Sequence, residues 1–332
     1  MAIEISEKML QPGVLTEWAS AVVYKNELSE EQKEISEVID EGVRKIGETG
    51  HDPNHEIASL IKKAFSPETV SAPSELIGRM FEESSIGEFD DTYVEVEPEN
   101  TMHVHEATIG GNVPASYIEH NFVKPTWCTL QAETYINMSD MRRGGYHTVA
   151  KHIEMINEAF ENKRVAMFIN KINDMITADK AGYIAEATGL PTEASADELA
   201  LYLHDKVDNG EVFMFMLNRY RQAMSKLAQA QRWPTEADKN MYNRDGFLNA
   251  YAGVPMIGFS GQKRLPDGTL IVPDKTIFGV AGKIGQAITR GEARVLEQED
   301  INSEKIHLKV SGFNFGYAIT DLSKVGKIVM AQ

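Results

Sequence analysis

One segment restricts the fold more than any other, because its helix signal continues for more than 30 residues. Apolar side chains recur there at spacings of three or four, with one gap: Val149, Ile153, Ile156, Phe160, Met167, Ile172, Met175 and Ile176. This spacing predicts one helix over 145–180. Thirty residues at 1.5 Å each give about 45–50 Å, whereas the mean helix has about 11–12 residues. We expect this helix to act as a strut across a whole domain.

The first 70 residues favour short helices separated by Gly and Pro. After Ser29, a helix is predicted through EEQKEISEVIDEGVRKIGE, where Ile35, Val38, Ile39 and Val43 recur at helical spacing. The helices share no common core period. We therefore expect an arm, 1–70, that packs on a larger body such as another subunit.

Residues 88–137 change character toward strand. TYVEVEPE alternates, and TWCTLQAETYIN is rich in Thr, Trp, Tyr and Ile, which favours β structure. Gly110, Gly111 and Pro114 lie between these two segments. We expect two long strands in a hairpin-like excursion, which is marginal alone and needs a surface to lie on.

The remainder of the chain mixes helix and strand. A short helix is predicted in DELALYLHDKV, a buried strand in EVFMFMLN and an amphipathic helix in RYRQAMSKLAQAQ. Short strands follow in GVPMIGFS, GTLIVPDKTIFGV and KIGQAITRG, and KIHLKVSGFNFGYAI alternates over a long stretch. The fold class is therefore predicted as α+β.

The charge distribution argues against recognition of nucleic acid. The net charge is −17, and residues 1–100 hold 23 acidic and 8 basic side chains. A protein that binds DNA or RNA directly needs the opposite sign to neutralise phosphates. An acidic protein is still suited to enclose DNA without adhering to it. No run of about 18 apolar residues occurs, so we expect no membrane contact.

The best candidate for a metal site is TMHVHEATIGG. On a strand His103 and His105 would share a face, and His120 follows shortly after. The cupin pattern needs a Gly before such a pair and a Glu after it, but Glu97 and Ile109 or Gly110 stand at those positions. The single cysteine excludes a multi-thiolate site. We expect no metal, and histidines that face solvent or an interface; a metal-dependent enzyme using His103, His105 and His120 is the alternative.

Two further motifs fail as catalytic signatures. A phosphate loop at GVAGKIG, 279–285, would need Gly at 277 and Ser or Thr at 284, but both positions are Ile. GFSGQ, 258–262, lacks the final Gly of a nucleophile elbow, so a turn is expected at Ser260. We therefore expect no catalytic residues, no cofactor and no enzyme activity.

The order of elements, with two short motifs, resembles a known family. An acidic helical arm, a long excursion, a very long helix and a mixed lobe occur in that order. Gly253-Val254-Pro255-Met256 and Asp321-Leu322-Ser323-Lys324 match a G-[VI]-P-[VI] strand and a closing D-x-x-K segment. The chain resembles the tailed-bacteriophage major capsid proteins of the Hong Kong 97-type fold, which encapsulin shells share. The resemblance implies an N-terminal arm at 1–70, an extended loop at 88–137, a peripheral domain at 71–87, 138–208 and 290–332 that contains the spine helix at 145–180, and an axial domain at 209–289.

The resemblance also implies a function. The expected role is a major capsid protein that self-assembles into the icosahedral head shell around the double-stranded DNA of a tailed phage. An encapsulin-like nanocompartment shell is the alternative. The expected partners are further copies in pentamers and hexamers, together with portal, scaffold or decoration proteins. The DNA would be enclosed without sequence-specific binding. The expected location is the virion, after synthesis in the cytoplasm of a bacterial host.

The same resemblance predicts where subunits touch. The arm helix would dock Ile35, Val38, Ile39 and Val43 on a neighbour, and the extended loop would place His103 and His105 over one. The axial loop would meet its copies at the capsomer centre, with Trp233 and Tyr242 as anchors; packing within the lobe is the alternative for these two. Some family members crosslink through a lysine on the extended loop. No lysine lies between Glu97 and His120, so we expect no such crosslink.

Overall fold

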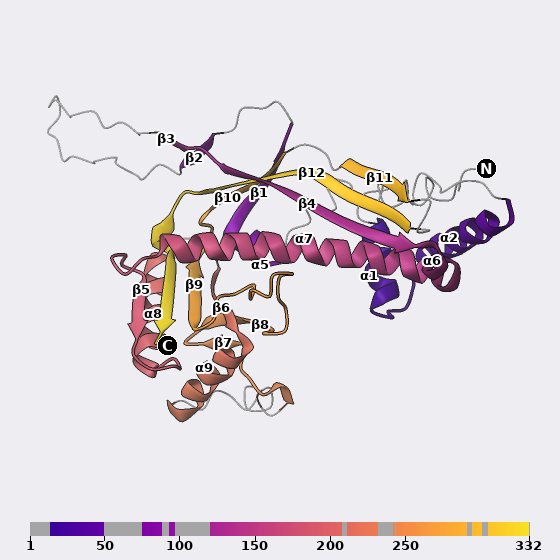
Figure 1. Ribbon diagram of the computed structural model, residues 1–332. Coiled ribbons are helices and arrows are strands. Elements are labelled where there is room, and N and C mark those ends of the chain that lie inside the picture. The colour runs from indigo at the N-terminus through magenta and orange to yellow at the C-terminus, as the bar shows by residue number, and fades with distance from the viewer. Residues whose placement is uncertain are drawn as a thin grey trace, which may run out of the picture.

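A single long helix organises the molecule. The computed structural model describes residues 14–49, 75–87, 93–96, 120–207, 211–231, 242, 244–290, 294–300 and 305–331. Helix α7 (Tyr146–Met175) confirms the strut predicted over 145–180. Figure 1 shows it crossing the molecule, with the arm helices at its amino-terminal end and a lobe at the other. Asp52 as an N-cap and Pro53 at the first helical position predict a further helix through Phe65, which lies outside the described residues.

The remaining helices and strands are distributed around α7. The other helices are α1 (Val14–Val23), α2 (Glu30–Thr49), α5 (Glu75–Met80), α6 (Met138–Gly144), α8 (Glu193–Lys206) and α9 (Asn218–Gln231). The strands are β1 (Phe81–Ile86), β2 (Val94–Val96), β3 (Asn121–Val123), β4 (Thr126–Asn137), β5 (Tyr183–Glu186), β6 (Val212–Leu217), β7 (Ala250–Tyr251), β8 (Val254–Phe259), β9 (Thr276–Ala281), β10 (Gly285–Arg290), β11 (Arg294–Asp300), β12 (Lys305–Ile319) and β13 (Val325–Met330).

The first sheet lies along α7 and is built on β12. Its order is β1-β10-β12-β11. Strands β10 and β11 pair with different parts of β12 along one edge, and β4 pairs with β12 along the other edge. The β4 strand matches the segment TWCTLQAETYIN, as its composition predicts. The expected partner of β4 is wrong. The sequence predicts that β4 forms a hairpin-like pair with TYVEVEPE, whereas in the structure β4 pairs with β12. The predicted two-stranded excursion, called the ribbon below, consists among the described residues of three antiparallel pairs between β2 and β3.

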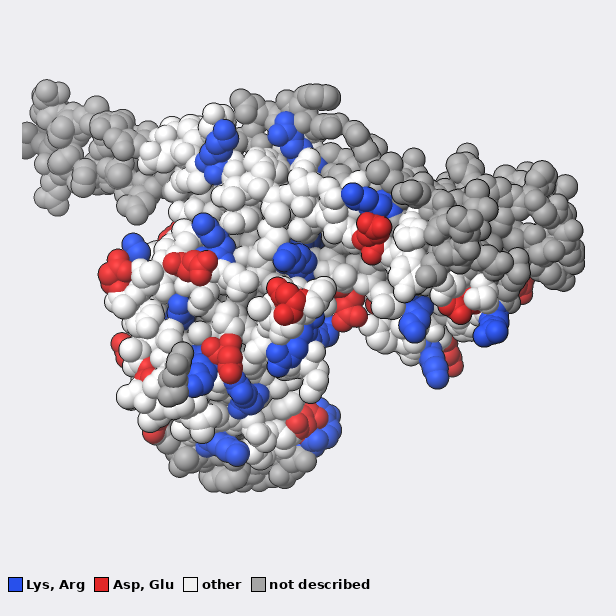
Figure 2. Space-filling view, viewed as in Figure 1, with Lys and Arg blue, Asp and Glu red and all other residues white. Residues whose placement is uncertain are grey.

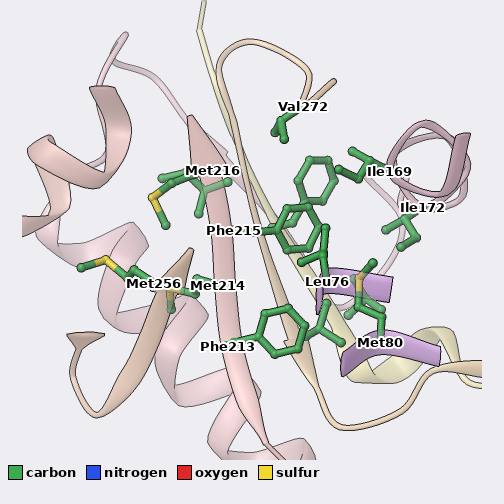
Figure 3. Close-up of a cluster of buried hydrophobic side chains, with 14 of the residues drawn as sticks. Leu76, Met80, Ile169, Ile172, Phe213, Met214, Phe215, Met216, Met256 and Val272 are labelled. Atoms are coloured by element: carbon green, nitrogen blue, oxygen red, sulfur yellow. The ribbon is translucent and has the colours of Figure 1, made fainter. Parts of the chain in front are cut away.

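The second sheet forms the lobe. Its order is β5-β13-β9-β6-β8-β7. Central strand β6 reads as an unbroken apolar run because both of its faces are covered. Figure 3 shows Phe213 and Phe215 on the side of α5 and α7, while Met214 and Met216 lie on the other side with Met256. This sheet draws β5 and β13 from outside 209–289, so the axial boundaries stay a prediction.

Helix α7 joins two hydrophobic cores. Its first half packs with α1, α2 and the face of β4, through side chains such as Ile153, Phe160 and Leu130. Its second half belongs to the main core of the lobe, where Phe168 contacts Phe315 and Phe81. A rigid element shared by both cores fixes the sheet, the arm and the lobe relative to one another.

Candidate subunit-contact surfaces

The arm helices pack on the chain's own long helix. Ile35 and Ile39 are buried in one core cluster with Trp18 and Ile153. The indole Nε1 of Trp18 donates a hydrogen bond to Ser36 Oγ at 2.9 Å. The expectation that Ile35 and Ile39 dock on a neighbour is therefore wrong, because α1 and α7 of the same chain already cover them.

The other two predicted arm contacts stay predictions. Val38 is half-buried, so part of its side chain remains accessible. The side chain of Val43 lies outside the described residues, although α2 continues through Thr49. Of the predicted Ile and Val stripe, Val38 is the described side chain that remains partly accessible for contact with a neighbouring subunit.

The root of the ribbon has one covered and one open face. Val94 and Val123 pair across the strands and pack with Trp127. On the opposite face, Tyr93 and Phe122 are each 59% exposed. Two exposed aromatic rings on one small face suit a contact with another protein. The alternation in TYVEV and HNFVK already places these rings opposite the valines, and this signal was available in the sequence.

The metal candidate is only partly described. The Nδ1 atom of His120 lies 2.5 Å from Glu95 Oε1 on the open face of the ribbon. Within the described part of the chain, no group of three or more His, Cys, Asp or Glu is arranged to hold a metal ion. His103 and His105 lie outside the described residues. His120 therefore has a carboxylate partner at the ribbon root.

The two failed motifs have structural roles. The Nζ atom of Lys283, in the Gly-Lys segment, donates hydrogen bonds to the carbonyl oxygens of Phe81 and Gly78, where α5 ends. Ser260 lies in the predicted turn, with its Oγ accepting from the backbone N–H of Gln262 at 3.2 Å. Lys283 thus satisfies a carbonyl in the last turn of α5 that has no partner within the helix, and the carbonyl of the first residue of β1.

The predicted anchors of the axial loop have separate outcomes. Trp233 lies outside the described residues. Tyr242 is half-buried and packs against the main core of the lobe. This position agrees with the alternative of packing within the lobe.

Groups with shifted pKa values occur at structural joints. Burial is the main cause that raises the pKa of Glu83, which faces Arg164. Hydrogen bonds, first from the Thr192 hydroxyl, lower the pKa of Glu186 to about 2. Each shift has a local packing or capping cause. Among the described residues, no helix is both long and apolar enough to cross a membrane.

Comparison with known proteins finds similarity in structure alone. No protein-family model matches the chain, and no curated protein matches its sequence. The solved capsid chain of the native GTA particle superposes with a TM-score of 0.55 at 13% identity, covering 77% of this chain and 90% of that one. The solved Gordonia phage Cozz chain gives 0.53 at 12% identity, with coverages of 80% and 93%. The Microbacterium phage Oxtober96 chain gives 0.52 at 11% identity, with coverages of 79% and 92%.

These superpositions cover nearly the whole of each matched chain. Because the identity is low, the likeness is one of fold. The chain has the Hong Kong 97-type capsid fold in the α+β class, which confirms the fold predicted from the order of elements.

Proposed function

We propose that this chain is a major capsid protein that self-assembles into an icosahedral head shell around the double-stranded DNA of a tailed phage. The observation that carries the proposal is the capsid fold over 77–80% of the chain. Fold similarity alone does not define a function. The proposal gains support because Lys283 and Ser260, from two motifs that could suggest catalysis, have structural roles.

The shape of the subunit suits repeated contacts. Figure 2 shows an arm that projects beside a rounded lobe, with a hollow between them. A closed shell repeats a few such contacts many times, so each can be individually weak. The open face of the ribbon root, with Tyr93 and Phe122, is the described surface best suited to lie over a neighbour.

The surface charge is compatible with a container for DNA. Figure 2 shows acidic and basic side chains interspersed on this face, without a broad basic area. Together with the net charge of −17, this favours enclosure of DNA over sequence-specific binding. Portal, scaffold and decoration proteins, synthesis in a bacterial cytoplasm and location in the virion belong to the same proposal.

Electron microscopy of the purified protein tests assembly. Closed particles of uniform size are expected, with or without a co-expressed scaffold. A chain that stays monomeric or forms only small oligomers in all conditions would contradict the proposal.

The cargo separates a virus from a nanocompartment. Particles isolated from the natural source are expected to contain nuclease-protected double-stranded DNA of uniform length. Particles that instead contain one co-purifying enzyme would identify an encapsulin-like shell. Mass spectrometry of the same particles measures whether the arm, 1–70, is cleaved on maturation.

A further inference from the structure

The accessible face of α7 carries charges sorted into two blocks. A basic block comes first and an acidic block follows it, on one stripe because each residue turns the helix by about 100°. Met155 lies between the blocks and is 57% exposed. The stripe consists of His147, Lys151, Glu154, Met155, Glu158 and Glu161.

This sorting is unfavourable within a single chain. Glu154 and Glu158 lie one turn apart, and like charges at that spacing destabilise a helix. Repulsion from Glu158 and Glu161 adds to burial, the main cause that raises the pKa of Glu154. Neighbouring elements relieve part of this repulsion. The hydroxyl of Tyr24, just after α1, donates a hydrogen bond to the carboxylate of Glu154. Lys263, in the loop after β8, pairs with Glu158 at 3.2 Å.

Two copies of the stripe are complementary when their α7 helices run in opposite directions, because the basic block of one then faces the acidic block of the other. A two-fold axis between positions 154 and 155 exchanges position 151 with 158, so Lys151 would face a glutamate. It also exchanges position 147 with 162, beside Glu161. It also places Met155 of each copy opposite Glu154 of the other, with both Met155 side chains beside the axis. Isologous contacts have this self-complementary character.

We propose that this stripe is a two-fold contact between two copies of the chain. The two α7 helices lie antiparallel, Lys151 of each copy pairs with Glu158 of the other, and the Met155 side chains pack at the axis. The inference rests on the proposed self-assembly and assigns one of its contacts. Other occupants fit less well, because nucleic acid is repelled by the acidic block and a basic protein by Lys151.

Cysteine crosslinking tests the geometry. In a Cys128→Ser background, Met155→Cys is expected to form disulfide-linked dimers on mild oxidation of assembled protein. Leu201→Cys is the matched control, because this side chain is 72% exposed on α8, away from the stripe. It is expected to stay monomeric on a non-reducing gel.

Charge reversal tests the pairing. Lys151→Glu alone places glutamates opposite each other twice, and Glu158→Lys alone does the same with lysines. Each is expected to reduce particle yield by about tenfold or more, because unlike partners have become like charges. An equimolar mixture restores both pairs across the axis, so its yield is expected to return. The intrachain effect on Lys263 is the same alone and in the mixture.

The outcomes separate this inference from the proposed function. Particles without a Met155→Cys dimer, or a mixture that assembles no better than its components, overturn the two-fold contact and leave the shell intact. A wild-type chain that never assembles overturns both. A Met155→Cys dimer together with rescue in the mixture supports the contact.

Discussion

The guanidinium of Arg164 on α7 lies 3.6 Å from the carboxylate of Glu83 on β1, and their side chains are 4% and 22% exposed. The same guanidinium stacks 4.3 Å above the ring centre of Phe315 on β12. Three elements therefore meet at one buried charge. Because β1 leads into the ribbon, this contact fixes one root of the ribbon on the long helix.

Removing one partner of this pair is expected to be much worse than removing both. Arg164→Met leaves a largely buried carboxylate without its ion-pair partner, which should lower the free energy of unfolding by about 3–5 kcal/mol. Arg164→Met combined with Glu83→Leu is expected to recover most of that loss. Urea denaturation of the unassembled subunit measures both. A double variant as unstable as Arg164→Met would show that lost packing, not the buried charge, is the cause.

The stability contribution of Glu83 is expected to depend on pH. Burial raises its pKa above the ordinary value of 4.5, although Arg164 and Lys283 oppose this. The folded chain then binds this proton more tightly than the unfolded chain. The contribution is therefore fully present below about pH 4.5 and lost as pH rises through the folded-state pKa. Relative to Glu83→Gln, the wild type should lose stability over that window, measured by denaturation between pH 4 and 7. A constant difference would contradict the raised pKa.

Lys327 is expected to stabilise the carboxyl-terminal end of α7. Its buried Nζ donates hydrogen bonds to the carbonyl oxygens of Asn173 at 3.0 Å and Ile176 at 3.1 Å. Helix-end carbonyls have no partner within the helix, so Lys327→Met should cost about 1.5–3 kcal/mol. Hydrogen exchange is expected to show faster opening of the last turn of α7, with the first half of the helix unchanged as the internal control. Equal acceleration along the helix would argue against a local cap.

Local periodicity explains which elements could be predicted. The stripe from Val149 to Ile172 and the composition of TWCTLQAETYIN each carry their signal within one segment, so α7 and β4 follow from the sequence. The full depth of burial of β6 follows in the same way from its continuous apolar run. The fold was recognised through the order of such elements.

Contacts between distant segments explain what could not be predicted. The stripe with Ile35 and Ile39 indicates that a face is buried, but it does not identify what covers it, and α1 does so here. The sequence from Ser74 to Glu83 also predicts a single helix, which would include residues 81–83. They belong to β1 instead, because Phe81 to Ile86 pair in parallel with β10, some 200 residues later. The charged stripe of α7, from His147 to Glu161, carries no apolar period, so the spacing of apolar residues does not indicate it.

The tight turn between β7 and β8 offers a stabilising substitution. Tyr251 pairs with Val254, so Ala252 and Gly253 form a two-residue loop, with φ of 48° and 83°. Asn adopts positive φ more readily than Ala. Ala252→Asn is therefore expected to stabilise the lobe by up to about 1 kcal/mol, which raises Tm by about 2 °C. Gly253→Ala is the opposing control and should lower Tm. An alanine is strained at a φ of 83°, although its Cβ would meet no atom closer than 3.9 Å. A lower Tm for Ala252→Asn would contradict this account.

Glu186 is expected to make a small contribution to stability that is lost in acid. Its carboxylate, at the end of β5, accepts hydrogen bonds from the hydroxyl and backbone N–H of Thr192, the N-cap of α8, and from Thr188. These bonds lower its pKa to about 2. A depressed carboxyl pKa contributes stability above the unfolded value near 4.5, and that contribution is lost as pH falls through about 2. Glu186→Gln should therefore be less stable than the wild type at pH 6 and similar to it near pH 2. Solvent screening keeps the difference small. Denaturation curves from pH 2 to 7 measure this convergence, and parallel curves would show that Glu186 titrates at its ordinary pKa.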